Sequence, residues 1–443
     1  MIGQIAFTLL LGVAVFFFAR RLGHIRSNIK LGRDLNRTDN RAARWRTMAR
    51  VALGQGKMVT RPVAGIMHII IYVGFLIVNI ELLEIVLDGL TGHHRLFAGS
   101  LGSVYPFLIN TFEIIAFLVV ISCVVFLARR WVMNIKRFHN PEMKGWPTRD
   151  ATIILIWEMV LMFCLFSMNA TDSILAARGA DHYTVAGPFA ISQYLVPLYE
   201  GIADNGTLAL LERAFWWTHI TGILGFLVYV TYSKHFHIIL AFPNTWYSNL
   251  TAKGRMTNME AVTNEVKLMM DPAADPYAAP PADAAPPQRF GAKDVQDLTW
   301  KNLMDAYTCT ECGRCTSNCP ANQTGKKLSP RKIMMDTRDR LEVVGVNIRA
   351  NGAYQDDGKA LLGDHISEEE LWACTSCNAC VESCPVNIDP LSIILDMRRY
   401  LIMEESKSPE SITAMFNNVE NNGAPWAFSA MDRDKWREEL NQA

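Results

Sequence analysis

The stretch CTECGRCTSNCP at residues 309–320 recurs with the same spacing as CTSCNACVESCP at residues 374–385. Each run has the pattern C-x2-C-x2-C-x3-C-P. This is the spacing of bacterial iron–sulfur cluster ligands, in which the fourth Cys of each run binds the other cluster. A zinc site would need Cys-x2-Cys pairs, so two identical triplets with a fourth Cys-Pro argue against zinc.

Exchange of the fourth Cys predicts two ligand sets in a ferredoxin-type domain. One [4Fe–4S] cluster is expected on Cys309, Cys312, Cys315 and Cys384, and the other on Cys374, Cys377, Cys380 and Cys319. The two remaining Cys, Cys123 and Cys164, stand alone in apolar stretches and are expected to be packing residues. Clusters on free thiols imply a reducing compartment.

The first 242 residues carry most of the apolar sequence, in runs near the roughly 20 residues that cross a bilayer as a helix. Five membrane spans are expected, at Ile2–Ala19, Val63–Ile80, Tyr105–Ala128, Ala151–Ala170 and Ala214–Phe242. The first has no charged start and no small-residue cleavage site, so it is expected to be an anchor rather than a signal peptide. Acidic and basic residues balance at 43 each, so the net charge gives no indication of nucleic-acid binding.

Basic residues predict the orientation of these spans. The segment Arg20–Arg61 holds twelve Lys or Arg and Arg129–Arg149 holds six, whereas Asp88–Val104 holds only Arg95 and Ala177–Thr207 only Arg178. By the positive-inside rule the N-terminus lies outside and the fifth span exits into the cytoplasm. The cluster domain then lies in the reducing compartment of a multi-pass protein of the cytoplasmic membrane.

Three His in the expected spans are candidate axial ligands of haem b. His219 and His237 are 18 residues apart, which on one straight helix means the same face and about 27 Å of axis. His68 is expected at the depth of His237, and these two are the first choice for a haem ligand pair. His235 falls off the shared face and is expected to reach for the interface. The alternative is that these His bond to neighbouring helices, and the sequence leaves open whether one or two haems bind.

Intramembrane acids are candidates for a proton path or for hydrogen bonds inside the bundle, and both interpretations stay open. They are Glu81, Glu113 and Glu158. The expected fold is thus an all-α bundle of five transmembrane helices followed by a mostly α-helical domain with two [4Fe–4S] clusters. Its expected parts are a haem b membrane domain at 1–245, a linker at 246–293 with an Ala/Pro-rich tether at Asp271–Arg289, a cluster domain at 294–400 and a partner-docking segment at 401–443. The basic stretch Lys326–Arg340 is expected to be helical, with room for a docking surface.

These motifs resemble a known combination. The membrane part is similar to the haem b gamma subunits of respiratory nitrate reductase, with matches at His68, His219 and His237 but no second His on the second span. The remainder resembles the cluster region of heterodisulfide reductase subunits, where the paired Cys runs precede a segment like Asn417–Phe428. The Cys-Cys-Gly domains of those reductases are absent from these 443 residues, so the resemblance implies that a cytoplasmic partner, with such domains or a flavin, supplies the organic-substrate site.

The expected function is electron transfer between that cytoplasmic partner, the two clusters, haem b and the quinone pool, as the electron-transfer subunit of a quinone-linked oxidoreductase in the lipid bilayer. Menaquinone reduction is the preferred direction by analogy alone. The alternative is a non-catalytic membrane redox sensor or docking platform. A transporter is disfavoured because the spans show no internal repeat.

Overall fold

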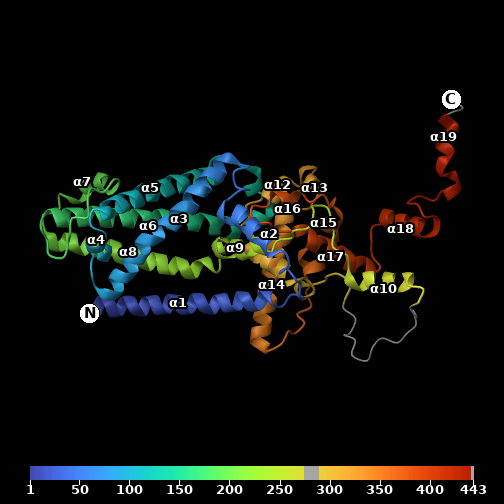
Figure 1. Ribbon diagram of the computed structural model, residues 1–443, viewed down its shortest axis with the longest axis horizontal. Coiled ribbons are helices and arrows are strands. Elements are labelled where there is room, and N and C mark those ends of the chain that lie inside the picture. Colours follow the sequence, from blue (N-terminus) through green and yellow to red (C-terminus); the bar gives the residue numbers. More distant parts are fainter. Residues whose placement is uncertain (274–288, 441–443) are drawn as a thin grey trace.

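The structure is a computed structural model that describes residues 1–273 and 289–440. Most of the expected Ala/Pro-rich tether lies outside the described residues. The molecule is elongated, with long helices at one end, short helices at the other, and the N-terminus at the end far from the short helices (Figure 1). The described residues form helices and no β-strand, as the expected all-α fold requires.

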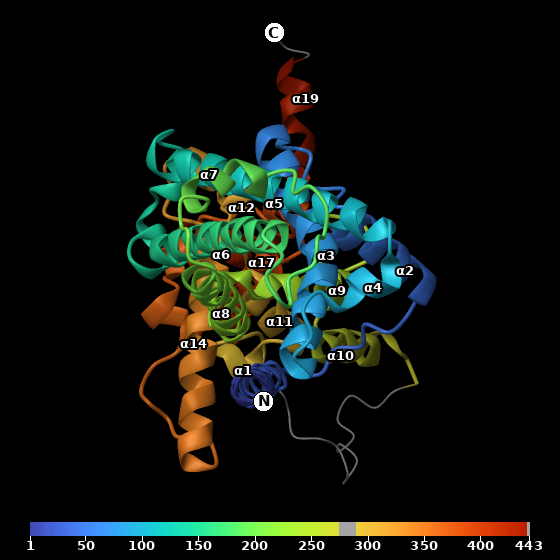
Figure 2. The same ribbon diagram turned by 90° about the vertical axis from the view of Figure 1, so that its left-hand side faces the viewer.

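Five long helices form the bundle, and viewed along its axis they stand side by side in front of the cluster domain (Figure 2). They are α1 (Ile2–Ile29), α3 (Pro62–Thr91), α5 (Val104–Trp131), α6 (Trp146–Ala177) and α8 (Asn205–Val230). The first four are long and apolar enough to cross a membrane, and α8 qualifies together with the segment Lys234–Trp246 that follows it. Proline in the first turn starts α3 and α6, and the Asp204 carboxylate caps α8 by accepting the N–H groups of Gly206 and Thr207.

The fifth span is not one straight helix, because the chain turns by 88° after α8. Ser233 has an extended backbone, and its hydroxyl accepts the N–H of His235 at 3.1 Å to begin a new turn before α9 (His237–Trp246). The prediction that His219 and His237 share one helix face about 27 Å apart is therefore wrong. Only about 16 Å of α8 follows His219, and His235 lies inside the turn instead of reaching away from it.

The cluster domain consists of short helices around the two Cys runs. They are α11 (Trp300–Thr308), α12 (Arg314–Ser317), α13 (Pro320–Gln323), α14 (Pro330–Asn351), α15 (Glu368–Trp372), α16 (Ala379–Ser383) and α17 (Pro390–Met403). Reciprocal capping boxes start α11 at Thr299 and α15 at Ser367. The remaining α-helices are α2 (Arg41–Met48), α4 (Leu96–Leu101), α7 (Val196–Tyr199), α10 (Glu260–Met270), α18 (Glu410–Asn422) and α19 (Lys435–Leu440).

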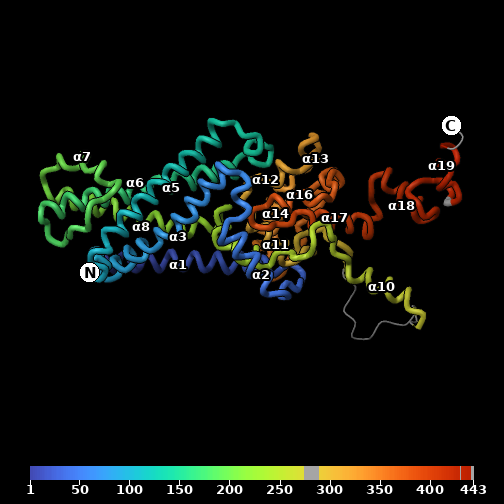
Figure 3. Tube along the Cα trace, turned by 45° about the horizontal axis from the view of Figure 1, so that its top comes forward, coloured from blue at the N-terminus to red at the C-terminus, as the bar shows by residue number. Residues whose placement is uncertain are grey.

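The cluster domain packs directly against the inner ends of the bundle, whereas α10, α18 and α19 extend away from the body (Figure 3). One hydrophobic core includes Ile25 of α1, Val230 of α8 and Leu240 of α9 together with Leu303 and Met397 of the cluster domain. Burial of this shared apolar surface stabilises the contact between the two parts. The membrane and cluster parts therefore form one packed unit irrespective of the linker.

Buried ion pairs reinforce this contact. Arg331 on α14 is fully buried. Its guanidinium donates a hydrogen bond of 2.7 Å to the carboxylate of Glu142, which lies in the loop between α5 and α6. Arg340 is also fully buried and pairs with Asp294 and Asp357. The expectation of a docking surface on the basic stretch Lys326–Arg340 is therefore wrong at these two Arg, whose charges are used inside the protein.

Glu142→Gln should destabilise the fold, because it leaves the buried Arg331 cation without its counter-charge. Breaking such a pair costs about 3–5 kcal/mol, which should appear as a lower midpoint of chemical unfolding in detergent. The matched control is Glu369→Gln, whose pair with Lys327 is solvent-exposed on both sides and is worth less than about 1 kcal/mol. Equal midpoints for the two variants would contradict the assigned role of Glu142.

The same pair should make stability depend on acid pH. Burial disfavours the carboxylate of Glu142, but Arg331 and the Ser329 hydroxyl outweigh burial and hold the pKa of Glu142 below its ordinary value. A folded pKa below the unfolded value of about 4.3 stabilises the protein at neutral pH, and this stabilisation is lost as the pH falls through the folded pKa. Below pH about 4 the unfolding midpoint of the native protein should thus fall more steeply than that of Glu142→Gln.

Candidate metal centres

The two Cys runs fold into loops with the same backbone conformation. In the first run Glu311 and Gly313 have left-handed φ angles of 53° and 69°, and in the second Ser376 and Asn378 have 57° and 61°. Left-handed residues on both sides of the middle Cys bend the loop around one point, so that successive thiols face the same side. The repeat in sequence is therefore also a repeat in geometry.

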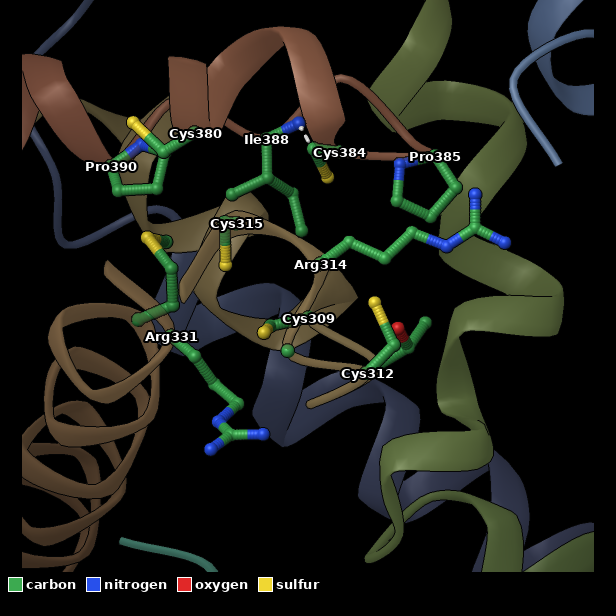
Figure 4. Close-up of a pocket in the computed structure, with 13 residues that line it drawn as sticks. Cys309, Cys312, Arg314, Cys315, Arg331, Cys380, Cys384, Pro385, Ile388 and Pro390 are labelled. Carbon is green, nitrogen blue, oxygen red and sulfur yellow. Dashed lines mark hydrogen bonds between the residues drawn. The ribbon is translucent and has the colours of Figure 1, made fainter. Parts of the chain in front are cut away.

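The first set of predicted thiols lines one pocket. The sulfur atoms of Cys309, Cys312, Cys315 and Cys384 point into the same space, although Cys384 comes from the other run (Figure 4). Cys380 borders the pocket too, but its sulfur points away from the centre (Figure 4). Gly313 and Arg314 complete the wall on the side of the first run.

The second set gathers on the other side of Cys380. Cys374 lies close enough to Cys319 and Cys377 for their charges to interact, and Cys380 has the same relation to Cys374 and Cys319. Each set thus combines three thiols of one run with the fourth of the other. Each set has two buried thiols, but the second set reaches the surface at Cys377, which is exposed.

Both burial and backbone N–H donors act on the thiols of these loops. Burial raises the pKa of Cys309 and of Cys384 to about 12 each, so iron coordination is needed to deprotonate them at neutral pH. The N–H of Ile388 donates to the Cys384 sulfur at 3.3 Å, and that of Ser376 donates to the Cys374 sulfur at 3.4 Å. Such bonds tune the reduction potential of a cluster.

The first pocket touches the inner end of the membrane bundle. Arg314 donates to the carbonyl oxygens of Lys57 and Met58 in the loop before α3, at 2.9 and 3.2 Å. Lys57 in turn donates to the carbonyl of Cys384 at 3.2 Å. Arg314 is also within electrostatic reach of His68 on α3. The wall of this pocket is therefore in direct contact with the membrane part.

His68 and His237 face each other across the inner end of the bundle. Their ring centres are 6.3 Å apart and their planes are inclined by 40°. Two imidazoles on opposite sides of one metal ion have centres about 6 Å apart, because a metal–nitrogen bond is about 2 Å long. Nδ1 of His237 is 3.1 Å from the Lys234 carbonyl, so it carries the proton and leaves Nε2 free as a ligand. The spacing of the two rings is therefore compatible with a metal ion held between them.

His219, like His237, carries its proton on Nδ1, but no other His ring lies against it among the described residues. Its Nδ1 donates to the Leu161 carbonyl at 2.9 Å, which also leaves Nε2 free. His94 of the outer loop, a possible partner, is hydrogen-bonded to Asp172 at 3.0 Å. His235 meets His237 edge to face, with ring centres 5.3 Å apart and planes at 87°, so a third His ring lies beside the His68–His237 pair.

The three intramembrane acids occupy different surroundings. Glu113 accepts hydrogen bonds from Asn169 and from the backbone of Ile191, so it anchors the outer loop before α7. Glu81 is buried, and one of its oxygens has no hydrogen-bond partner among the described residues. Glu158 is half-buried on α6. The proton path stays a prediction. The hydrogen bonds of Glu113 favour the other interpretation for this residue, a role in holding the bundle together.

One functional acid in the first Cys loop, Glu311, was not predicted from the sequence. Glu311, between Cys309 and Cys312, is buried, and its carboxylate pairs with Lys234 from the turn after α8 and with Arg338 of α14. These cations hold the pKa of Glu311 below its ordinary value against the opposing effect of burial. The signal was present in the stretch TYSK at residues 231–234, which interrupts the apolar run and ends in a Ser cap and a Lys.

Residues 308–388 match the family model of the 4Fe-4S dicluster domain. The chain carries a 4Fe-4S dicluster domain. The match covers both Cys runs and the segment between them, and it supports the binding of iron–sulfur clusters by this part of the chain.

Relatives extend over the membrane part as well. A Bacillus subtilis protein named "Probable iron-sulfur-binding oxidoreductase FadF" is 27% identical over 99% of this chain and 61% of its own length. The "EtfAB:quinone oxidoreductase" of Syntrophomonas wolfei is 25% identical over 92% of this chain and 55% of its own. This chain thus spans a little over half of each of these relatives.

Other relatives match a shorter part of the chain. One polypeptide of the "Ferredoxin/F(420)H(2)-dependent CoB-CoM heterodisulfide reductase" of Methanosarcina acetivorans is 32% identical over 24% of this chain and 53% of its own length. The resemblance to heterodisulfide reductase-related iron–sulfur proteins is confirmed. No solved structure matches the chain at a significant level.

Gly313→Ala should remove the first cluster and spare the second. A Cβ at this left-handed position would lie 2.4 Å from Nη1 of the buried Arg331, which cannot move away from Glu142 without losing its ion pair. Iron analysis should then give about four irons per chain instead of about eight. Asn378→Gly, at the equivalent position of the second run, should keep all eight; equal loss in both variants would contradict the assignment.

Proposed function

We propose that the protein is a membrane electron-transfer subunit that relays electrons between a cytoplasmic redox partner and the quinone pool. The observation that carries this proposal is the contact between the first thiol pocket and the inner end of the bundle, where Arg314 joins the cluster loop to the segment before His68. A direct contact of this kind makes an electron step between the two centres short. The dicluster domain and the oxidoreductase relatives support a redox role.

The ligand assignment follows the two thiol sets. The first [4Fe–4S] cluster is assigned to the set that lines the pocket of Figure 4, and the second to the set that contains Cys377. When bound, the clusters supply one-electron transfer. The exposed thiol of Cys377 supports the second cluster as the point of exchange with the partner, and the burial of Cys309 supports the first as the link to the membrane.

Haem b is assigned to His68 and His237, whose neighbouring rings would hold its iron. The bound haem supplies the electron carrier between cluster and quinone. The chain's own contribution is to hold each ring: the Lys234 carbonyl orients His237, and His235 packs against it from the side. His219 faces no other His ring in the described part of the chain, so we assign one haem.

The orientation places the N-terminus outside and the dicluster domain in the cytoplasm. The position of the N-terminus at the end of the bundle far from the cluster domain supports it, as does the concentration of Lys and Arg at the cluster end (Figure 1). The partner is a cytoplasmic protein with a Cys-Cys-Gly or flavin redox site. The name of the Syntrophomonas wolfei relative supports a quinone at the other end of the relay.

An optical redox titration of the purified protein tests the relay, with iron and haem quantified in the same sample. Addition of a quinol analogue should reduce the haem and then the clusters, and a quinone analogue should reverse this. A haem-containing protein whose redox state ignores quinone and quinol would exclude the relay in favour of a sensor or docking role.

Axial-ligand variants should separate one haem from two. His68→Ala and His237→Ala should each abolish the haem absorbance, because either change removes one of the two axial nitrogens. His219→Ala should leave the haem content unchanged. If His219→Ala loses the haem and His68→Ala keeps it, the haem is bound by His219 and not by His68.

A further inference from the structure

Two cations beside the first thiol pocket have no carboxylate partner in the described part of the chain. Arg314 is 4% exposed, and its guanidinium donates to the carbonyl oxygens of Lys57 and Met58. The half-buried Lys57 ammonium donates to the carbonyl oxygen of Cys384 at 3.2 Å. Carbonyl oxygens satisfy the hydrogen-bond donors, but they do not balance the two positive charges. A buried cation without a counter-charge is costly, so these charges need an anion nearby.

Of the described residues, the acidic groups within electrostatic reach of these cations are thiols of the first set. They are Cys384 for Lys57, and Cys312 and Cys384 for Arg314. The Arg314 side chain runs past these two Cys (Figure 4). Glu311, the buried acid of the same loop, is already paired with two cations. Four thiolates on a bound cluster would supply the missing negative charge.

The second thiol set has a different electrostatic environment. Arg398 of α17 donates to the Cys374 carbonyl oxygen at 2.6 Å, and its charge is within reach of the Cys374 thiol. The Asp389 carboxyl, in contrast, lies close enough to Cys380 for their negative charges to interact. Among the described residues, the first set thus has two unbalanced cations, one of them from the membrane part, whereas the second set has one cation and one nearby acid.

Burial by itself opposes reduction of the first cluster. The first set has no exposed thiol, whereas Cys377 opens the second set to water. Water stabilises an added negative charge better than a low-dielectric interior does. Burial therefore lowers the reduction potential of the first cluster relative to the second, unless nearby cations act in the opposite direction. Cluster potentials respond to both effects.

We propose that Lys57 and Arg314 are the counter-charges of the first [4Fe–4S] cluster and raise its reduction potential, so that a centre without an exposed thiol accepts electrons from the second cluster. The inference rests on the proposed relay and adds the groups that set the potential of its middle centre. The step is a one-electron reduction, [4Fe–4S]²⁺ + e⁻ → [4Fe–4S]⁺, in which no bond forms or breaks. The cytoplasmic redox partner supplies the electron through the second cluster, and the two side chains stabilise the charge that it adds.

A purely mechanical role is the competing explanation, in which both cations only fasten the loop before α3 to the cluster domain. Carbonyl oxygens accept hydrogen bonds from neutral donors as well, so fastening alone does not require a charge. Each thiol set also has a cation that donates to the carbonyl of one of its own Cys, Lys57 in the first and Arg398 in the second. These cations come from different parts of the chain, and the repeated contact favours an electrostatic role.

The test removes the charge of Lys57 and measures the potential of each cluster. The full protein in detergent is titrated with redox mediators and followed by low-temperature electron paramagnetic resonance. Lys57→Gln should lower the potential of the first cluster by at least about 59 mV, a tenfold change in the ratio of its two redox states. The second cluster should keep its native potential, and Lys57→Arg, which retains the charge, should titrate like the native protein. Gly313→Ala, expected to retain the second cluster alone, identifies the signal of that cluster.

Further variants separate a local charge effect from a general one. Lys253→Gln is the matched control, because Lys253 is exposed and already paired with Glu382, and both potentials should stay native. Arg314→Gln supplies a second variant with the same expected shift as Lys57→Gln. Arg398→Gln should lower the potential of the second cluster instead of the first.

Iron analysis should give about eight irons per chain in these Lys and Arg variants, which shows that the cluster domain folds. A native first-cluster potential in both Lys57→Gln and Arg314→Gln would overturn the assigned counter-charges. Equal shifts of both clusters, or a shift in Lys57→Arg as large as in Lys57→Gln, would do the same. The relay would still stand, because mediators and not quinol set the potential in this titration. A native protein that exchanges no electrons with quinol would instead overturn the relay itself.

Discussion

The buried ion pair between Lys234 and Glu311 is the interaction that fixes the turn after α8 against the first cluster loop. Lys234 stands in the turn where the fifth span changes direction, and Glu311 stands inside the first cluster loop. Both side chains are shielded from water, so separating them would leave a charge without a partner in a low-dielectric region, at a cost of several kcal/mol. The pair therefore keeps the turn and the loop together. Because His235 and His237 follow within three residues of Lys234, the pair also holds these two His on the side of the bundle that meets the cluster domain.

Around this pair, polar contacts and a shared apolar core join two parts that an Ala/Pro-rich linker would otherwise leave independent. Arg331 reaches the loop between α5 and α6, Arg314 reaches the loop before α3, and Ile25 and Leu240 enter the core of the cluster domain. Rigid contact matters for electron transfer because the rate depends steeply on the distance between centres. A domain that moved on a flexible tether would meet the membrane centre only part of the time. The packed arrangement keeps one distance and leaves Cys377 exposed, as exchange of electrons with the proposed partner would require.

Sequence patterns were sufficient where the chemistry is local. The Cys spacing indicated the cluster domain, and hydropathy indicated five spans, because ligand runs and membrane crossing both impose rules within short stretches. The same reasoning is wrong for the fifth span, where the 18-residue spacing of His219 and His237 predicts one face of one straight helix. The polar stretch at residues 231–234 ends that helix, and the benefit of turning comes from Lys234 meeting Glu311, 77 positions away in sequence. Likewise, Arg331 and Arg340 looked like a surface patch because their acidic partners are distant in the chain.

The amino-acid order alone thus specifies which groups are available: eight thiols in two matched runs, apolar stretches long enough for a bilayer, and His residues within or beside them. Folding specifies which of those groups meet. It brings Cys384 to the thiols of the first run, His68 to His237, and the rings of Trp157, Phe226 and His235 into one row. The physical reason is that ligand type and hydrophobicity are properties of single residues and short windows. Distances between centres arise from long-range packing and from buried charges that must find partners, and neither leaves a periodic trace in the chain.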